Sequence, residues 1–143
     1  MTLSPFALAL LEFLEMLELV GYLDSHGIPT AGYGHTGPDV KVGETYTSEQ
    51  ASAWLLVDTW KAQSAVERGV TVPLLQHEYD ALVLFAFNVG ITALTNSSLL
   101  KALNQGDKAS AANDFLAWNH VQGVVNTGLT HRRKLERALF LDT

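Results

Sequence analysis

The chain opens with apolar residues at helical spacing. They follow the i, i+3, i+4 pattern of a helix with one apolar face, and they are Phe6, Leu10, Phe13, Leu14 and Leu17. We expect this face to be buried. The stretch has no basic start and no small-residue cleavage site, and Glu12 and Glu15 interrupt it. It therefore does not have the pattern of a signal peptide or a membrane span, and it predicts a first helix of a globular core.

The helical spacing breaks at about residue 21. Eight glycines and prolines fall within residues 21–46, which is too many for a helix. Between them lie short extended runs with the sequences GYL, IPTAGYG and VGETYT. These runs predict a small, twisted sheet of two or three strands.

Helical signals return at Thr47. In the sequence TSEQ, the Thr47 hydroxyl can accept from the backbone N–H of Gln50, and the Gln50 side chain can accept in return from the N–H of Thr47. We expect a long helix from this capping box to about Arg68, followed by helices at about 75–88, 96–104, 107–118 and 128–141.

These elements predict an α+β fold with one domain in two lobes. The small sheet lobe covers about residues 14–60. An all-helical lobe covers about residues 61–143 together with the N-terminal helix, and the long helix joins the two. A chain of 143 residues is long enough for such a core.

Composition and charge exclude several function classes. The chain has no cysteine, which excludes disulfides and thiolate chemistry. The first 60 residues carry eight acidic side chains and the single base Lys41, and the net charge of the whole chain is −6. This balance argues against nucleic acid as the main partner. A basic run near the end is typical of a solvated helix face; it consists of Arg132, Arg133, Lys134 and Arg137.

The segment GYGHTG, residues 32–37, matches the G-x-G-x-x-G pattern of dinucleotide-binding loops. Such a loop must open a helix, whose N-terminus holds the pyrophosphate. Here turn and strand residues follow Gly37, no helix is expected before Thr47, and no Walker lysine is present. The glycines instead predict a tight turn of the sheet.

Two carboxylates and a hydroxyl lie close to this turn in the sequence. Glu15 is on the first helix, Asp24 ends the first strand, and Thr30 begins the return strand. A proton-donating carboxylic acid with a second carboxylate is what glycoside hydrolysis requires. Glu12 and Glu18 compete with Glu15 for the acid role. Helical spacing would place Leu8, Leu11 and Leu19 around Glu15, and such an apolar collar favours the protonated form. The alternative, that all three glutamates are solvent-facing charges, stays open at this point.

The order of these residues resembles that of phage-type lysozymes, the endolysin muramidases of glycoside hydrolase family 24. The family pattern is a glutamate, an aromatic residue and an aspartate in the strand, a threonine in the return strand, and GYGHT. The matching residues are Glu15, Tyr22, Asp24, Thr30 and the segment from Gly32 to Thr36. Later stretches also resemble family blocks in order: VPLLQHEYDALVLFAFNVG, SSLLKALNQGD, FLAWN and GLTHRRKLERALFL.

The resemblance implies a lysozyme-like fold with an active-site cleft between the lobes. It implies Glu15 as the general acid, Asp24 as the partner carboxylate and Thr30 as a residue that holds the attacking water, with inversion as the usual outcome. By motif position it places five residues along the saccharide cleft: Gly34, Thr36, Phe87, Asn88 and Ser97. We expect His35 to tie the sheet lobe together rather than contact substrate.

The function implied is that of an endolysin muramidase, which hydrolyses the β-1,4 bond between N-acetylmuramic acid and N-acetylglucosamine in peptidoglycan and so leads to host cell lysis. No cofactor is expected, and the histidines lack metal-ligand spacing. The implied partners are peptidoglycan and, for access to the wall, a holin. We expect a monomer without a membrane span that stays in the host cytoplasm until the membrane opens and then acts in the periplasm.

Two departures from the family pattern keep a rival open. Met16 stands where glycine usually follows the catalytic glutamate, and the chain is acidic whereas many relatives are basic. We expect the basic C-terminal helix to compensate in part as a wall-facing patch. The rival is a catalytically weak or inactive peptidoglycan-binding module on the same fold. A further alternative is an enzyme that cuts another aminosugar polymer, such as chitin.

Overall fold

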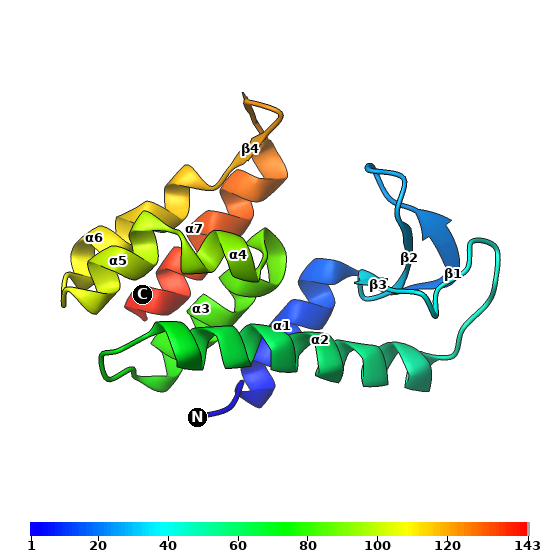
Figure 1. Ribbon diagram of the computed structural model, residues 1–143, viewed down its shortest axis with the longest axis horizontal. Coiled ribbons are helices and arrows are strands. Elements are labelled where there is room, and N and C mark those ends of the chain that lie inside the picture. The colour runs from blue at the N-terminus through cyan, green and yellow to red at the C-terminus, as the bar shows by residue number, and fades with distance from the viewer. Residues whose placement is uncertain (143) are drawn as a thin grey trace. The chain divides into compact units, whose positions relative to one another are not determined.

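The computed structural model describes residues 1–142 and confirms the α+β class (Figure 1). The chain divides into two compact units. The sheet unit is Leu8–Trp60, and the helical unit consists of Met1–Ala7 with the chain from Lys61 onward. Both dividing points fall inside helices, in α1 (Pro5–Glu15) and in α2 (Ser48–Gly69).

The sheet unit contains three antiparallel strands in the order β1-β2-β3. They are β1 (Glu18–Leu23), β2 (Pro29–Gly32) and β3 (His35–Thr36). The expected strand VGETYT is wrong, because it forms only an isolated bridge from Thr45 to Val20. The segment turns at Gly43, which has a left-handed φ of 85°, and its backbone hydrogen bonds to β1 involve only Gly21 and Leu19.

Helix α1 does not bury the face that the spacing predicted. Phe6 and Phe13 are 66% and 78% exposed, whereas Ala7 and Leu11 are fully buried. Ala7 and Leu11 are four residues apart and share one line along the helix. Because most of α1 is apolar, spacing alone could not select which line would be covered.

Helix α1 ends at Glu15 because Met16 takes a left-handed conformation with φ of 56°. The Met16 N–H still bonds the Glu12 carbonyl, at 3.2 Å, which closes the last turn. Leu19 therefore belongs to β1 and not to the helix. The expected leucine collar around Glu15 is wrong in this respect, since helical spacing no longer applies to Leu19.

Helix α2 begins with the predicted capping box. Gln50 N donates to Thr47 Oγ1 at 3.1 Å, and Thr47 N donates to Gln50 Oε1 at 2.9 Å. The first turns of α2 contribute Trp54 to a small core with Ala31, Val40 and Tyr46. One face of the sheet is thereby fixed on α2.

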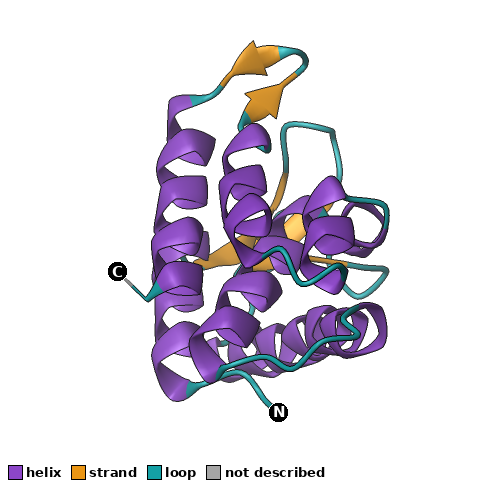
Figure 2. Cartoon of the chain, turned by 90° about the vertical axis from the view of Figure 1, so that its left-hand side faces the viewer, coloured by secondary structure: helices purple, strands orange, loops and turns teal. Residues whose placement is uncertain are grey.

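The helical unit is built around α3 (Gln76–Val89), of which nine consecutive residues are buried. The remaining elements are α4 (Ile91–Thr95), α5 (Ser98–Asn104), α6 (Lys108–Asp114), the 3-10 turn η1 (Phe115–Ala117), β4 (His120–Val121), β5 (Val124–Val125) and α7 (Thr127–Leu141). The pattern did not predict α4 or the β4–β5 hairpin, which leads into α7 (Figure 2). Aromatic contacts of Phe115 with Phe85 and with Phe140 join the η1 turn, α3 and α7.

The basic run of α7 is not a solvated face. Arg133 and Glu136 are fully buried and Arg132 is 8% exposed, while Lys134 faces solvent. Glu136 lies three and four residues after the two arginines, so its carboxylate can bond both: Arg133 Nε is 3.0 Å and Arg132 Nε is 3.1 Å from it. The prediction of a wall-facing basic patch is therefore wrong for Arg132 and Arg133, which are buried.

None of the helices within residues 1–142 combines the length and apolar character needed to cross a membrane.

Candidate active site

The three-stranded sheet places Thr30 between Tyr22 and Thr36. Thr30 pairs with Tyr22 of β1 on one side and with Thr36 of β3 on the other. Residues directly opposite one another share a face of the sheet, so these three side chains form one row. The next pair, Ala31 with His35, lies on the other face, which packs on α2. The candidate residues Thr30 and Thr36 thus occupy the face opposite to the packed one.

Asp24 is held by the turn between β1 and β2. Its Oδ1 accepts from the backbone N–H of His26 at 2.8 Å and of Ile28 at 2.9 Å. The N–H of Ile28 chiefly, with that of His26, lowers the pKa of the Asp24 carboxyl below its ordinary value of 3.8, against a smaller opposing effect of burial. This turn therefore fixes Asp24 as an ionised carboxylate.

The Thr30 hydroxyl is oriented by the backbone of the same residue, Ile28. Thr30 Oγ1 donates to the carbonyl oxygen of Ile28 at 2.9 Å, and the residue is buried. Ile28 thus bonds Asp24 through its N–H and Thr30 through its C=O. Because the Thr30 proton is used, its remaining capacity is to accept a hydrogen bond, as from a water molecule.

Glu15 is the last residue of α1 and is half-buried. A Cβ added to Gly34 would lie 3.4 Å from Glu15 Oε2, so the carboxylate faces the turn between β2 and β3. Glu18, in contrast, is exposed and accepts from the backbone of Val20 at 3.2 Å. Glu15 thus lies beside the glycine-rich turn, whereas Glu18 faces solvent.

The glycine-rich segment is a turn of the sheet, as predicted. Gly32 ends β2, Gly34 has a left-handed φ of 78°, and β3 follows. The next helix starts only at Ser48, so no helix N-terminus is available to a phosphate at this loop. This excludes the geometry of a dinucleotide-binding fingerprint.

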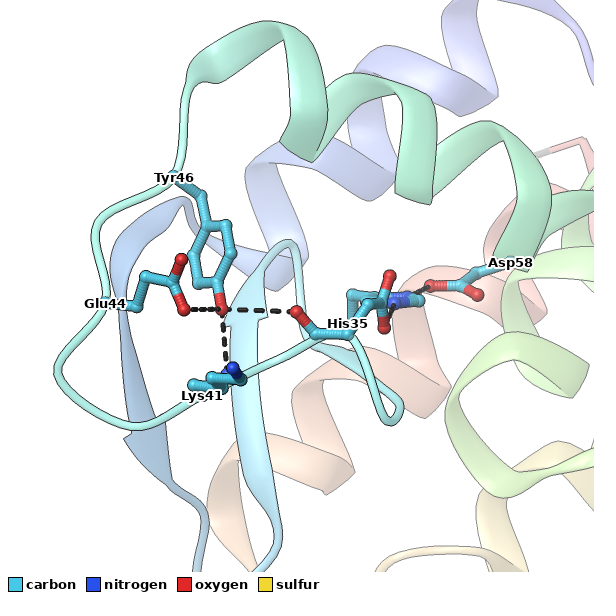
Figure 3. A network of polar contacts seen from close by, with 6 residues as sticks. His35, Lys41, Glu44, Tyr46 and Asp58 are labelled. Carbon is cyan, nitrogen blue, oxygen red and sulfur yellow. Dashed lines mark hydrogen bonds and ion pairs between the residues drawn. The ribbon is translucent and has the colours of Figure 1, made fainter.

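His35 ties the sheet to α2, in agreement with its expected role. Its ring stacks on Trp54 with centroids 4.5 Å apart. One ring nitrogen lies 2.8 Å from Asp58 (Figure 3), and the other lies 3.1 Å from Asp39. In the same network, the Tyr46 hydroxyl accepts from Lys41 N and donates to the Asp39 carbonyl. His35 is buried, so these contacts use its ring within the fold.

The other predicted site residues belong to the helical unit. Phe87 is partly buried against the main core, whereas Asn88 is exposed. Ser97 is buried and caps α5: its hydroxyl accepts from Leu100 N at 3.0 Å and donates to Leu94 O at 2.7 Å. The Ser97 hydroxyl is therefore used within the fold, and its contact with a ligand stays a prediction.

Asn88 lines a cavity of about 470 Å³ that is open to solvent and is formed by residues of the helical unit. The other lining residues are Val89, Ala117, Trp118, His120 and Leu129. The sequence pattern gave neither Trp118, which lies in the block FLAWN, nor His120 a role in the site. Only the turn after η1 and the β4–β5 hairpin, which the pattern did not predict, bring both to Asn88.

Within residues 1–142, no group of three or more histidine or carboxylate side chains could hold a metal ion.

Comparison with known proteins identifies the family. The profile of the family described as phage lysozyme matches residues 12–136. The endolysin of Salmonella phage P22 is 40% identical over 145 residues, with 99% of each chain covered. The endolysin of Acyrthosiphon pisum secondary endosymbiont phage 1 is 39% identical, with 98% of each chain covered.

Solved structures give the same result. The endolysin from Escherichia coli O157:H7 phage FAHEc1 superimposes with a TM-score of 0.91 at 43% identity, covering 99% of this chain and 94% of that one. The muramidase domain of SpmX from Asticaccaulis excentricus has a TM-score of 0.90 at 34% identity, covering 98% and 97%. The lysozyme-like fold class is thus confirmed, and the chain belongs to the phage lysozyme family of glycoside hydrolases.

Proposed function

We propose that the protein is an endolysin muramidase that hydrolyses the β-1,4 bond between N-acetylmuramic acid and N-acetylglucosamine of bacterial peptidoglycan. The observation that carries the proposal is the backbone of Ile28, which bonds Asp24 through its N–H and Thr30 through its C=O. This arrangement supplies an ionised carboxylate and a hydroxyl that can accept from water, both held by one residue. Glu15, in the same unit, faces the adjoining turn.

In the proposed reaction, Glu15 is the general acid that protonates the leaving glycosidic oxygen. Asp24, kept ionised by its backbone bonds, takes the proton of the attacking water or stabilises the cationic transition state. Thr30 accepts a hydrogen bond from that water. Single displacement with inversion is proposed because it is the usual outcome in this family, and product stereochemistry tests it.

Gly34 and Thr36 of the sheet unit, together with Phe87 and Asn88 of the helical unit, are proposed to contact the glycan. The proposal includes action as a monomer, access to the wall through a holin, and a location in the host cytoplasm until the membrane opens and in the periplasm afterwards. Gel filtration tests the first of these points. Lysis timing with and without a co-expressed holin tests the others.

The experiment compares wild type, Glu15→Gln and Glu12→Gln for the release of reducing ends from purified peptidoglycan. Glutamine keeps the shape of Glu15 but cannot supply a proton, so we expect a rate loss of roughly a thousandfold. Glu12→Gln removes the same charge from the same helix and should stay near wild type. If Glu15→Gln cleaves normally, the acid is misassigned. Wild type that binds the wall but releases no reducing ends is instead the inactive binding module.

A further inference from the structure

The guanidinium of Arg133 holds the side chain of Asn88 from inside the helical unit. Arg133 is fully buried, and its Nη2 donates to Asn88 Oδ1. Its Nε lies 3.0 Å from Glu136, and its guanidinium carbon lies 5.2 Å from the centre of the Phe85 ring. Besides Asn88, the guanidinium therefore contacts the buried carboxylate of Glu136 and the aromatic face of Phe85, and these two contacts hold it in place.

This contact decides which end of the Asn88 amide faces outward. A guanidinium carries only donors, so the atom of Asn88 that meets Arg133 must be the carbonyl oxygen. Rotating the amide by half a turn would place its NH₂ group against N–H groups of Arg133. Asn88 is exposed and lines the cavity together with Trp118 and His120, so the group that it has left to offer a ligand there is the NH₂ group.

We propose that Arg133 is a positioning residue that orients Asn88 as a pure donor, and that the Asn88 NH₂ group binds an amide carbonyl oxygen of the glycan, that of an N-acetyl group. This inference rests on the proposed function and adds the chemistry of one contact to it. An N-acetyl carbonyl oxygen can only accept, which matches a side chain locked as a donor. A sugar hydroxyl can donate or accept and would need no such lock.

The test compares Asn88→Asp with Asn88→Ala, using affinity for soluble glycan strands. Aspartate keeps an oxygen toward Arg133, so this variant should fold with a melting temperature no lower than that of wild type. Its outward atom is now an acceptor and opposes a carbonyl oxygen. We expect the Kd of Asn88→Asp to rise by about tenfold or more, and to exceed that of Asn88→Ala.

Any other order of the Kd values of these variants overturns the proposal. A hydroxyl partner could turn and donate to aspartate, so an Asn88→Asp variant that binds better than Asn88→Ala contradicts the carbonyl assignment. So does an Asn88→Asp variant that binds like Gln105→Glu, an exposed control that makes the same amide-to-carboxylate change. A loss that disappears on strands freed of their stem peptides places the acceptor in the peptide and contradicts the N-acetyl group.

Arg133 itself is tested with Arg133→Lys and Arg133→Gln, each measured where circular dichroism shows a folded protein. Both variants lose the planar fork, so a purely structural role would weaken binding equally. Lysine still presents only donors and keeps the Asn88 orientation, whereas glutamine can accept and releases it. The inference predicts a several-fold higher Kd for Arg133→Gln than for Arg133→Lys, and equal Kd values overturn it.

All affinities are measured on a Glu15→Gln background, where strands are bound without being cleaved. Wild type that shows no cleavage therefore overturns the proposed function alone. The order of the Kd values of the Asn88 variants tests only this inference and leaves the proposed function untouched.

Discussion

His35 Nδ1 lies 2.8 Å from Asp58 Oδ2, which links β3 to α2 across 23 residues of sequence. Both side chains are largely removed from solvent, at 10% and 20% exposure. A contact of this kind holds the turn that carries Gly34 against the helix, since the His35 ring also stacks on Trp54.

Asp58→Asn should lower the free energy of unfolding by about 1–3 kcal/mol, because the histidine loses an ionised partner in a partly buried site. Glu49→Gln removes a charge from an exposed position of the same helix and should cost less than about 0.5 kcal/mol. Urea denaturation at pH 6 measures both. Equal effects of the two substitutions would contradict a structural role for the His35–Asp58 pair.

Asp39 should make stability depend on pH at the acid end. Burial by itself would raise the pKa of Asp39, but the hydrogen bond from His35 and the charge of that ring lower it below 3.8. A depressed folded-state pKa adds stability above the unfolded pKa, and this contribution is lost as pH falls through the folded value. Wild type should thus exceed Asp39→Asn by up to about 1 kcal/mol above pH 5, and this difference should shrink below pH 3.8. A constant difference across the titration would contradict the assignment.

Met16→Gly should stabilise the protein by about 1 kcal/mol. Met16 ends α1 with φ of 56°, a conformation that costs about 1 kcal/mol for a side chain and little for glycine. Met16→Ala removes the exposed side chain but keeps the strain, so it should change stability little. Thermal unfolding of the pair separates backbone from side chain, and a gain for alanine equal to that for glycine would refute the backbone explanation.

Gly21→Ala should prevent stable folding of the sheet unit or cost at least about 3 kcal/mol. A Cβ at this position would lie 2.1 Å from the carbonyl oxygen of Lys41, which is backbone and cannot move aside. Gly27→Ala is the matched control: Gly27 has φ of 76° but nothing within 4 Å of an added Cβ, so about 1 kcal/mol is expected. Similar unfolding midpoints for the two variants would show that the Lys41 backbone moves to make room for the added Cβ.

Asp24 should keep the enzyme active into the acid range. Because the N–H groups of Ile28 and His26 lower the pKa of Asp24 below 3.8, the carboxylate stays ionised through pH 4. The acid limb of kcat/KM should accordingly lie below pH 3.8 while the protein remains folded, and Asp24→Asn should be inactive throughout. Rates on soluble glycan strands, with circular dichroism in parallel, check this. An acid limb above pH 5 in folded protein would exclude the assignment.

Local chemistry made much of this structure predictable. The Thr47–Gln50 capping box fixed the start of α2, and the glycines around Tyr33 fixed a sheet turn in place of a phosphate loop, because both depend on neighbouring backbone groups. The spacing of Glu15, Asp24 and Thr30 carried the family resemblance. It did not contain the backbone hydrogen bonds of Ile28 that orient Asp24 and Thr30, since those bonds exist only once the turn has formed.

The sequence by itself determined which residue types were available: the apolar first helix, the acidic front half and the basic run of α7. The tertiary structure decided which of them are covered. Ala7 and Leu11 are buried in place of Phe6 and Phe13, and Arg133 lies buried with Glu136 against Asn88. The physical reason is that burial and charge pairing depend on partners distant in sequence. A pattern along one segment can show that a face is apolar or basic, but it does not contain the group that will meet it.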